Sequence, residues 1–438
     1  MSSTQRRVVV TALGAISPIG STREELWNAL STGTSGIGPL TVLPPETVDM
    51  HCAGEAKNFS GKIGDFGPLQ PAQKKLIRKA LKVMCRECQM GVAAAQLALS
   101  DAALDLEKIE PLRSGIEFGA DYMLSVPEEF NEGVLQCLDE SGNFEFSRWA
   151  KEGLPKLTPL WLLKYLPNMP ASHLAIFNDF RGPNNSLTLR EASANLAVGE
   201  AYQVILRGDA DMMLVGSTGT RLHPMKLIHA TQQEELATCD GDPATASRPF
   251  DKNRTGMVLG EGAAAIVLEE LSAAEARGAN ILGEVVGSSS SAVAGRHLSA
   301  QRDQAMINAL RAVLQSSGIE PDELGHLNAH GLSTRQGDVE EARAIHEVFG
   351  SRSEPLPIVA PKSYFGNMGA GSGMLELATS LLALDAGQLF PVLNYETPDP
   401  ECPLAVVTGH DTPAGETFVN LSVTPQGQAS AVAVRKVG

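Results

Sequence analysis

MGVAAAQLALSDAALDLEKIEPLRSGIEFGA (residues 90–120) and MINALRAVLQSSGIEPDELGHLNAH (residues 306–330) follow the same pattern in two distant parts of the chain. Each stretch begins with a helical run rich in alanine or leucine and passes through an acidic segment into a short apolar strand. The expected elements are the helices Val92–Ala103 and Met306–Ser317 and the strands Ser114–Ala120 and Leu324–His330. This repetition predicts a duplicated α/β unit.

The rest of the chain alternates helices and strands in the same way. Arg7–Ala15 predicts a buried strand, and Glu24–Leu30 predicts a helix capped by Ser21 or Thr22. Further helices are expected at 194–207, 303–316 and 371–386, and further strands at 211–216, 263–270, 418–423 and 429–435. The alternation is typical of an α/β architecture with covered sheets.

The seam between the repeated units is expected near 271–280, which divides the chain into halves at 1–270 and 271–438. Leu124–Ile176 is richer in proline, tryptophan and acidic residues than its surroundings. We therefore expect this segment to be an insertion that caps a site or builds an interface.

Composition excludes several classes of protein. The 438 residues carry a net charge of -16, and the densest basic stretch is isolated in this acidic chain, so we expect no nucleic-acid partner. The basic residues of that stretch are Lys74, Lys75, Arg78, Lys79 and Lys82. No apolar run reaches the length of about 18 residues that a membrane span needs. The N-terminus also lacks a leader pattern, and we expect a cytoplasmic protein.

Six cysteines are spread along the chain: Cys52, Cys85, Cys88, Cys137, Cys239 and Cys402. Cys85 and Cys88 form a CxxC motif, but no second pair or nearby histidine completes a zinc site. Free thiols on a helix face in a reducing cytoplasm are the simpler interpretation. We expect neither a metal nor a cofactor.

Five groups of segments carry a resemblance to a known family. They are Arg7–Gly20; Gly182–Asn184 with Gly199–Ala201 and Arg207–Asp211; Ser247–Asp251 with Gly260–Ala263; Asn328–Gly331 with Ser333–Thr334 and Gly337–Asp338; and Lys362–Ser363 with Gly366 and Gly373, followed by Asn394–Pro400. In this order and spacing, the chain resembles the elongating β-ketoacyl-acyl-carrier-protein synthases over essentially its whole length. The resemblance implies a thiolase-like fold, with two similar halves in a five-layered αβαβα arrangement, normally as a dimer.

Such enzymes load an acyl group onto a cysteine at a helix N-terminus, where the thiol pKa is lowered. Two histidines then stabilise the enolate that forms when malonyl-carrier loses CO2. Aligned to the family motifs, the cysteine position holds Glu191 and the second histidine position holds Asn367, while His330 is in place. The resemblance therefore implies a Glu–His–Asn site that lacks the condensing nucleophile.

Glu191 does not replace a thiol, because its attack on a thioester would give an easily hydrolysed mixed anhydride. A carboxylate at a helix N-terminus instead accepts the N–H groups that a substrate oxygen would use. Arg190 is a candidate counter-charge, and without partners a buried Glu191 would have a raised pKa. The alternative is an idle surface glutamate at the start of a helix.

Two further sets of residues match family positions. Lys362 and Glu376 match charged positions near the second histidine, or form an ordinary ion pair. The family's glycine-rich gate loop, with its phenylalanine, corresponds to Thr424, Pro425 and Gln426. Thr424 retains an N–H for an acyl oxyanion, but Pro425 stiffens the loop and the bulky gate is missing.

Four functions remain open. The first is a non-condensing subunit, similar to chain length factors, that pairs with an intact ketosynthase. The second is a malonyl-carrier decarboxylase that uses His330 and Asn367, and the third is an unnamed acid/base reaction of Glu191 and His330. The fourth, a condensing enzyme, requires a cysteine that the segment from Gly182 to Gly199 lacks. The expected partners are an acyl carrier protein with acyl or malonyl phosphopantetheine, and a second subunit in a homodimer or heterodimer.

Overall fold

The computed structural model describes residues 6–43, 50–105 and 108–437. Its strands are β1 (Val8–Ile16), β2 (Ile37–Pro39), β3 (Cys52–Gly54), β4 (Ser114–Ala120), β5 (Asn184–Thr188), β6 (Met212–Thr220), β7 (Glu261–Glu270), β8 (Gly283–Ala292), β9 (His326–Asn328), β10 (Pro357–Val359), β11 (Ala405–Val406), β12 (Thr417–Val423) and β13 (Gln428–Arg435). Its α-helices are α1 (Arg23–Thr32), α2 (Pro71–Ala80), α3 (Arg86–Asp101), α4 (Asn131–Gln136), α5 (Met169–Asn178), α6 (Ser193–Leu206), α7 (Pro224–Thr231), α8 (Leu271–Ala276), α9 (Arg302–Ser317), α10 (Arg335–Phe349), α11 (Lys362–Phe365) and α12 (Ala370–Ala386). The elements expected from sequence are present with small changes of boundary, and β9 is shorter than expected.

The central sheet repeats one strand arrangement twice. Its order is β11-β10-β9-β12-β13-β8-β1-β7-β6-β4-β5, and the two arrangements meet where β1 pairs with β8. In the first, β1 and β6 flank β7 antiparallel, and β6, β4 and β5 run parallel. In the second, β8 and β12 flank β13 antiparallel, and β12, β9 and β10 run parallel. The duplication inferred from the helix–strand pattern is therefore present in the strand order.

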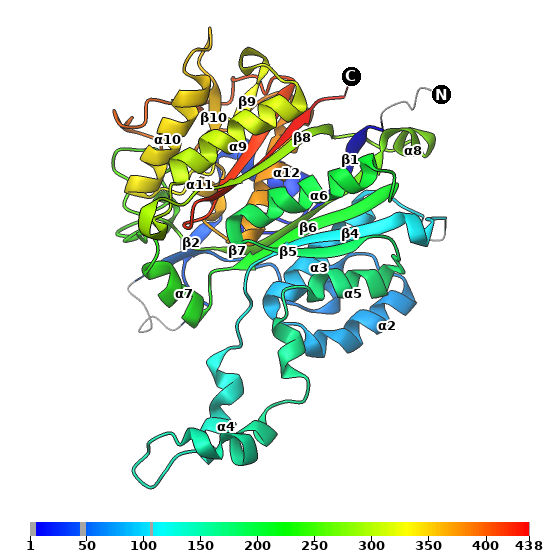
Figure 1. The fold of residues 1–438 in the computed structure, drawn as a ribbon, viewed down its shortest axis with the longest axis vertical. Coiled ribbons are helices and arrows are strands. Elements are labelled where there is room, and N and C mark those ends of the chain that lie inside the picture. The colour runs from blue at the N-terminus through cyan, green and yellow to red at the C-terminus, as the bar shows by residue number, and fades with distance from the viewer. Residues whose placement is uncertain (1–5, 44–49, 106–107, 438) are drawn as a thin grey trace.

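Helices cover both faces of each half of the sheet (Figure 1). Helix α3 packs on β1, β7 and β6 from outside, and α9 packs in the corresponding position on β8 and β13. Helices α6 and α12 lie between the two halves and contact strands of both. This layering confirms the expected five-layered α/β arrangement.

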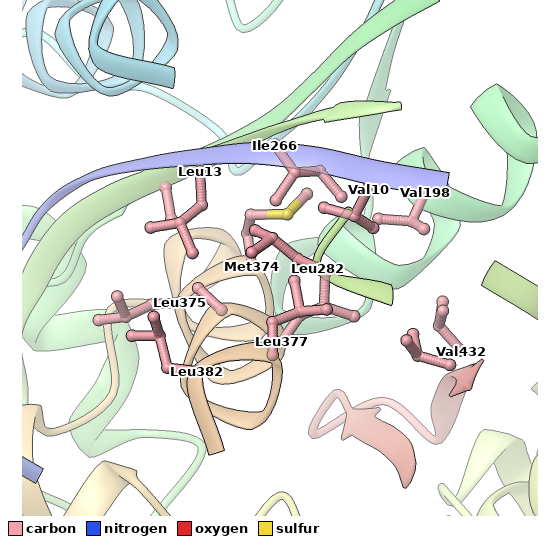
Figure 2. Packing of buried hydrophobic residues seen from close by; sticks show 14 of the residues in the cluster. Val10, Leu13, Val198, Ile266, Leu282, Met374, Leu375, Leu377, Leu382 and Val432 are labelled. Carbon is pink, nitrogen blue, oxygen red and sulfur yellow. The ribbon is translucent and has the colours of Figure 1, made fainter. Parts of the chain in front are cut away.

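The core of the middle layer explains the apolar composition of α12 (Figure 2). Met374 and Leu375 of α12 lie beneath Leu13 of β1 and Ile266 of β7, and all four side chains are buried. Because α12 lies between the sheet halves, it is buried around its whole circumference from Ala370 to Leu384 rather than on one stripe.

The expected insertion leaves the body of the molecule over most of its length. Figure 1 shows the chain after β4 extending away from the sheet as a projecting arm that carries α4. The chain returns at α5, which packs on α3 and β4, so residues 169–176 belong to the body. We call residues 124–168 the arm.

No helix in the part of the chain that the structure describes is both long and apolar enough to cross a membrane.

Candidate functional site

Three charged side chains lie together just beyond the carboxyl ends of three parallel strands. Asp121 directly follows β4, Arg221 directly follows β6, and Glu191 lies in a short 3-10 turn between β5 and α6. Because these strands are adjacent and parallel, their carboxyl ends lie at the same edge of the sheet. All three residues are buried.

Arg221 is the principal partner of Glu191. Its Nη2 atom donates to Oε1 of Glu191 at 2.5 Å and lies 3.3 Å from Oδ2 of Asp121. Burial on its own would raise the pKa of Glu191, but Arg221, and then Arg190, outweigh it and hold this pKa at about 2. Glu191 is therefore an ionised, paired carboxylate, and the alternative of an idle surface residue is wrong.

The loop after α11 makes room for Arg221. Gly369 has φ +66°, and a Cβ atom there would lie 3.0 Å from Nε of Arg221 and 3.2 Å from Oδ2 of Asp121. The position therefore requires glycine for both its backbone conformation and its space.

Arg190 supplies a second, weaker counter-charge. Its Nε lies 3.7 Å from Oε2 of Glu191, and its Nη1 donates to Oε1 of Gln233 at 2.6 Å. Arg190 has φ +55°, in the left-handed region that non-glycine residues rarely adopt. The strained turn lets both Arg190 and Glu191 face the same cavity.

Asn367 is held by the protein rather than left for a ligand. Its Nδ2 atom donates to Oε1 of Glu191 at 3.3 Å and to Sδ of Met257 at 3.1 Å. Its Oδ1 atom accepts from the backbone N–H of Gly369 at 3.0 Å and from the Ser372 hydroxyl at 3.3 Å. The donor expected for an enolate is already used within the site.

His330 is neutral, and its contact with Lys362 identifies which ring nitrogen carries the hydrogen. Lys362 donates through Nζ to the His330 carbonyl at 2.7 Å and lies 3.2 Å from its Nδ1. Burial lowers the pKa of His330 well below its ordinary value, and the Lys362 charge lowers it further. Because a lysine ammonium only donates, Nδ1 of His330 accepts and Nε2 carries the hydrogen.

The groups behind His330 fix its position. Lys362 also forms a buried ion pair with Glu376, and Glu341 accepts the backbone N–H groups of His330 and Gly331 at 2.6 and 2.8 Å. Lys362 thus contacts both His330 and Glu376, whereas Glu341 was not among the residues predicted from sequence.

The loop between β12 and β13 does not offer the expected oxyanion donor. The backbone N–H of Thr424 donates to the Gln428 carbonyl at 2.9 Å as part of the hairpin. Thr424 and Pro425 line the cavity beside Glu191, while Gln426 is exposed at the turn and is not among the lining residues. The expectation that Thr424 offers its N–H to an acyl oxygen is therefore wrong for this structure.

The cavity at Glu191 has room for about one water molecule. Its volume is about 20 Å³, and its walls include Glu191, His330, Asn367 and Met306. A bound ligand of drug size typically occupies a pocket of about 300–1,000 Å³. The structure brings the Glu–His–Asn set together, but around a space too small for an acyl chain.

Sequence reasoning missed Arg221 and Asp121, the residues that make a buried Glu191 tolerable. Neither belongs to a motif, since each is the first residue after a strand. The available signal was positional: polar residues at the carboxyl ends of adjacent parallel strands gather at one edge of a sheet.

Comparison with known proteins gives the class to which this fold and site belong. The family model for the N-terminal domain of β-ketoacyl synthases matches residues 5–274, and the model for the C-terminal domain matches residues 282–396. The chain belongs to the β-ketoacyl synthase family.

Three relatives illustrate the similarity. The 3-oxoacyl-[acyl-carrier-protein] synthase 2 of Synechocystis sp. is 33% identical over 407 residues, which cover 92% of each protein. A solved structure described as the ishigamide ketosynthase/chain length factor aligns with a TM-score of 0.83 and 27% identity, covering 99% of this chain and 100% of the other. AntDE:AntF, a type II polyketide acyl-carrier protein in complex with its ketosynthase, aligns with a TM-score of 0.81, the same coverage and 24% identity, which shows the shared fold alone.

Proposed function

We propose that this chain is a non-condensing subunit, comparable to a chain length factor, that pairs with an intact ketosynthase. The observation that carries the proposal is the ion pair of Glu191 with Arg221 at the nucleophile position, beside a cavity of about 20 Å³. A carboxylate that is paired with an arginine does not accept an acyl group, and a cavity of this size has no space for one.

The arm supplies a surface for a partner. Its exposed apolar side chains are Val126, Leu135, Phe144, Phe146, Leu154, Leu160 and Leu162. Phe130 packs on Trp161 with ring centroids 5.3 Å apart, so the arm has an aromatic centre of its own. An apolar surface gathered on one projecting segment is typical of a protein interface.

The named relatives fit this assignment. The ishigamide structure pairs a ketosynthase with a chain length factor, and AntDE:AntF joins a ketosynthase to its acyl-carrier protein. By this analogy, the partner of our chain is an intact ketosynthase, and the pair acts on acyl groups borne by a carrier protein.

Co-purification tests the pairing. The chain is co-expressed with an intact ketosynthase from its own organism, with a tag on one subunit only, and the complex is weighed by native mass spectrometry. We expect a 1:1 heterodimer. Homodimers of each chain, with no mixed species, would contradict the proposal.

The alternative function is decarboxylation of malonyl-carrier. Co-purification does not test this activity, so it needs a separate assay. His330 retains a free donor at Nε2, but Asn367 is occupied by Glu191 and Met257. The ionised Glu191 also repels a malonyl carboxylate. We therefore expect mass spectrometry of malonyl-carrier incubated with the chain to show no acetyl-carrier above background, and its appearance would favour the decarboxylase.

A further inference from the structure

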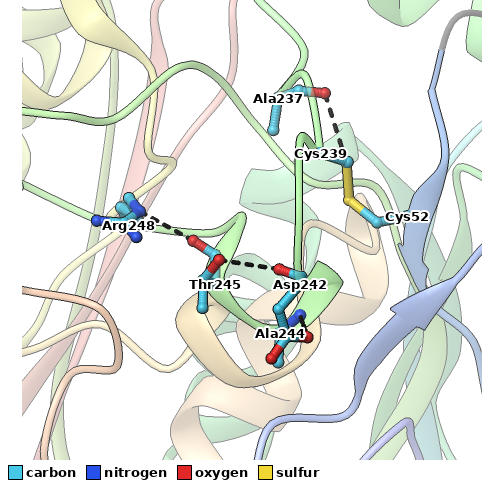
Figure 3. Close-up of a disulfide and its surroundings, with 7 residues drawn as sticks. All are labelled: Cys52, Ala237, Cys239, Asp242, Ala244, Thr245 and Arg248. Atoms are coloured by element: carbon cyan, nitrogen blue, oxygen red, sulfur yellow. Dashed lines mark hydrogen bonds between the residues drawn. A yellow bond between two sulfur atoms is a disulfide. The ribbon is translucent and has the colours of Figure 1, made fainter.

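A disulfide joins two segments that are 187 residues apart in sequence (Figure 3). Cys52 lies on β3 and Cys239 lies in the loop that connects α7 to the 3-10 turn beginning at Pro243. Their Cα atoms are 5.9 Å apart, within the range that a disulfide requires. The other four cysteines are free thiols. Nothing in the sequence around Cys52 and Cys239 indicated that these two would pair.

The loop that Cys239 anchors, residues 232–242, forms one wall of the Glu191 cavity. Gln233 accepts from Arg190 at 2.6 Å, and Glu234 accepts from Nη1 of Arg302 at 2.6 Å. Gln233, Glu234 and both arginines line the cavity. The same loop thus carries the disulfide near one end and the contacts that close the cavity near the other.

We propose that the disulfide is a reversible latch on this loop, which keeps the Glu191 cavity closed when oxidised and lets the loop move when reduced. Between the two ends, the loop is held by backbone bonds of Glu235 and Ala237 to Met257, at 2.8 and 3.0 Å. Glu235 also accepts from the backbone N–H of Arg335 at 3.2 Å, and Leu236 packs against the apolar cluster that contains Met257, while most other side chains of the loop are exposed. The disulfide adds a covalent link to these contacts, and its opening leaves the loop held by non-covalent contacts alone.

The two cysteines of the bond differ in burial. Cys52 is fully buried, whereas Cys239 is half-buried and packs with Ala237 and Val258. A dithiol reductant attacks the sulfur of Cys239, the thiolate of Cys52 leaves and takes up a proton, and the second thiol of the reductant resolves the mixed disulfide. Two electrons and two protons pass to the cysteines, and the dithiol becomes a disulfide.

The place of the bond in the fold fits a regulatory disulfide. Disulfides in reducing compartments are usually transient and regulatory, whereas structural ones belong to oxidising compartments. This bond lies in the loop that forms one wall of the Glu191 cavity, which fits the transient and regulatory kind.

Hydrogen exchange of the full chain tests the latch. Oxidised protein is compared with protein reduced by dithiothreitol, and we expect peptides from 232–242 to exchange at least about tenfold faster after reduction. Peptides from α12, which is buried, should not change. Equal exchange of the loop in both states would overturn the proposal.

Two controls sharpen the result. Alkylation under denaturing conditions should label four cysteines before reduction and six after it, and six labels before reduction would show that no disulfide exists. The double variant Cys52→Ser/Cys239→Ser should exchange fast at the loop in both conditions, while Cys137→Ser, at a buried free thiol, should keep the wild-type response. The comparison of oxidised with reduced wild-type protein stands even if a variant fails to fold. The exchange measurement uses neither a partner subunit nor a carrier protein. The latch proposal can therefore be wrong while the proposed pairing with a ketosynthase is right.

Discussion

Glu191 and Arg221 each depend on the other for a place in the protein interior. Both side chains are at most 3% exposed, and a lone charge at this depth costs several kcal/mol of folding free energy. Glu191 is therefore tolerated as a buried carboxylate because Arg221 faces it.

Arg221→Met tests this dependence. The variant leaves the carboxylates of Glu191 and Asp121 buried without their cation, so we expect the free energy of unfolding at pH 7 to fall by about 3–5 kcal/mol. Urea denaturation measures the loss. The double variant Glu191→Leu/Arg221→Met should be no less stable than Arg221→Met alone, because it removes one of the stranded charges.

A matched control comes from the surface. Arg207 also pairs with carboxylates, but its side chain is 51% exposed, so Arg207→Met should change the free energy of unfolding by no more than about 0.5 kcal/mol. If Glu191→Leu/Arg221→Met is less stable than Arg221→Met alone, Glu191 and Arg221 do not interact in solution.

His330 makes stability depend on pH. Its pKa in the folded protein is far below the value of about 6.5 in an unfolded chain, so only the unfolded state takes up a proton as pH falls below that value. Between pH 7.5 and 5, this uptake should lower the free energy of unfolding by about 2 kcal/mol. His330→Gln should remove that part of the loss, as measured by urea denaturation at a series of pH values. An unchanged pH slope would show that His330 is not buried in its neutral form.

We predict that the arm carries the interface for the proposed partner. Phe146 is 76% exposed and Leu135 is 64% exposed, so glutamate at both positions should leave the free energy of unfolding within about 1 kcal/mol of wild type. The same double change should weaken pairing with the ketosynthase at least about tenfold, because charges would enter an apolar interface. Analytical ultracentrifugation measures the affinity. Leu298→Glu, at an 88% exposed site outside the arm, should pair normally, and equal effects of both changes would contradict a role for the arm.

Elements with a strong local signal were predictable, and contacts between distant segments were not. The strand at β4 and the helix at α12 follow from apolar runs, and the cap of α1 at Thr22 follows from its hydroxyl and Glu25. Glu191, His330 and Asn367 were found through family motifs. Arg221 was not predicted because its role arises only when β6 lies beside β4. The disulfide was not predicted because it forms only when two segments 187 residues apart in sequence come together in the fold.

Across the whole molecule, the features on which we base the proposed loss of condensation come from separate parts of the chain. Glu191 precedes α6, the engaged N–H of Thr424 belongs to the β12–β13 hairpin, and the cavity wall that Gln233 forms follows α7. These segments meet only because the duplicated halves pack on a shared middle layer. Restoring the side chains of one segment leaves the other two unchanged.

The double variant Glu191→Cys/Asn367→His therefore should not become a condensing enzyme. It restores the family's Cys–His–His set, but the cavity of about 20 Å³ is far below the roughly 300 Å³ that even a small ligand pocket needs. The N–H of Thr424 also stays bonded to Gln428 and does not stabilise an acyl oxyanion. Incubation with acyl-carrier and malonyl-carrier, followed by mass spectrometry, should show no 3-oxoacyl-carrier above background, with an intact ketosynthase as the positive control. Product formation by the double variant would mean that the closed cavity opens for substrate, and that Glu191 and Asn367 alone separate this chain from its condensing relatives.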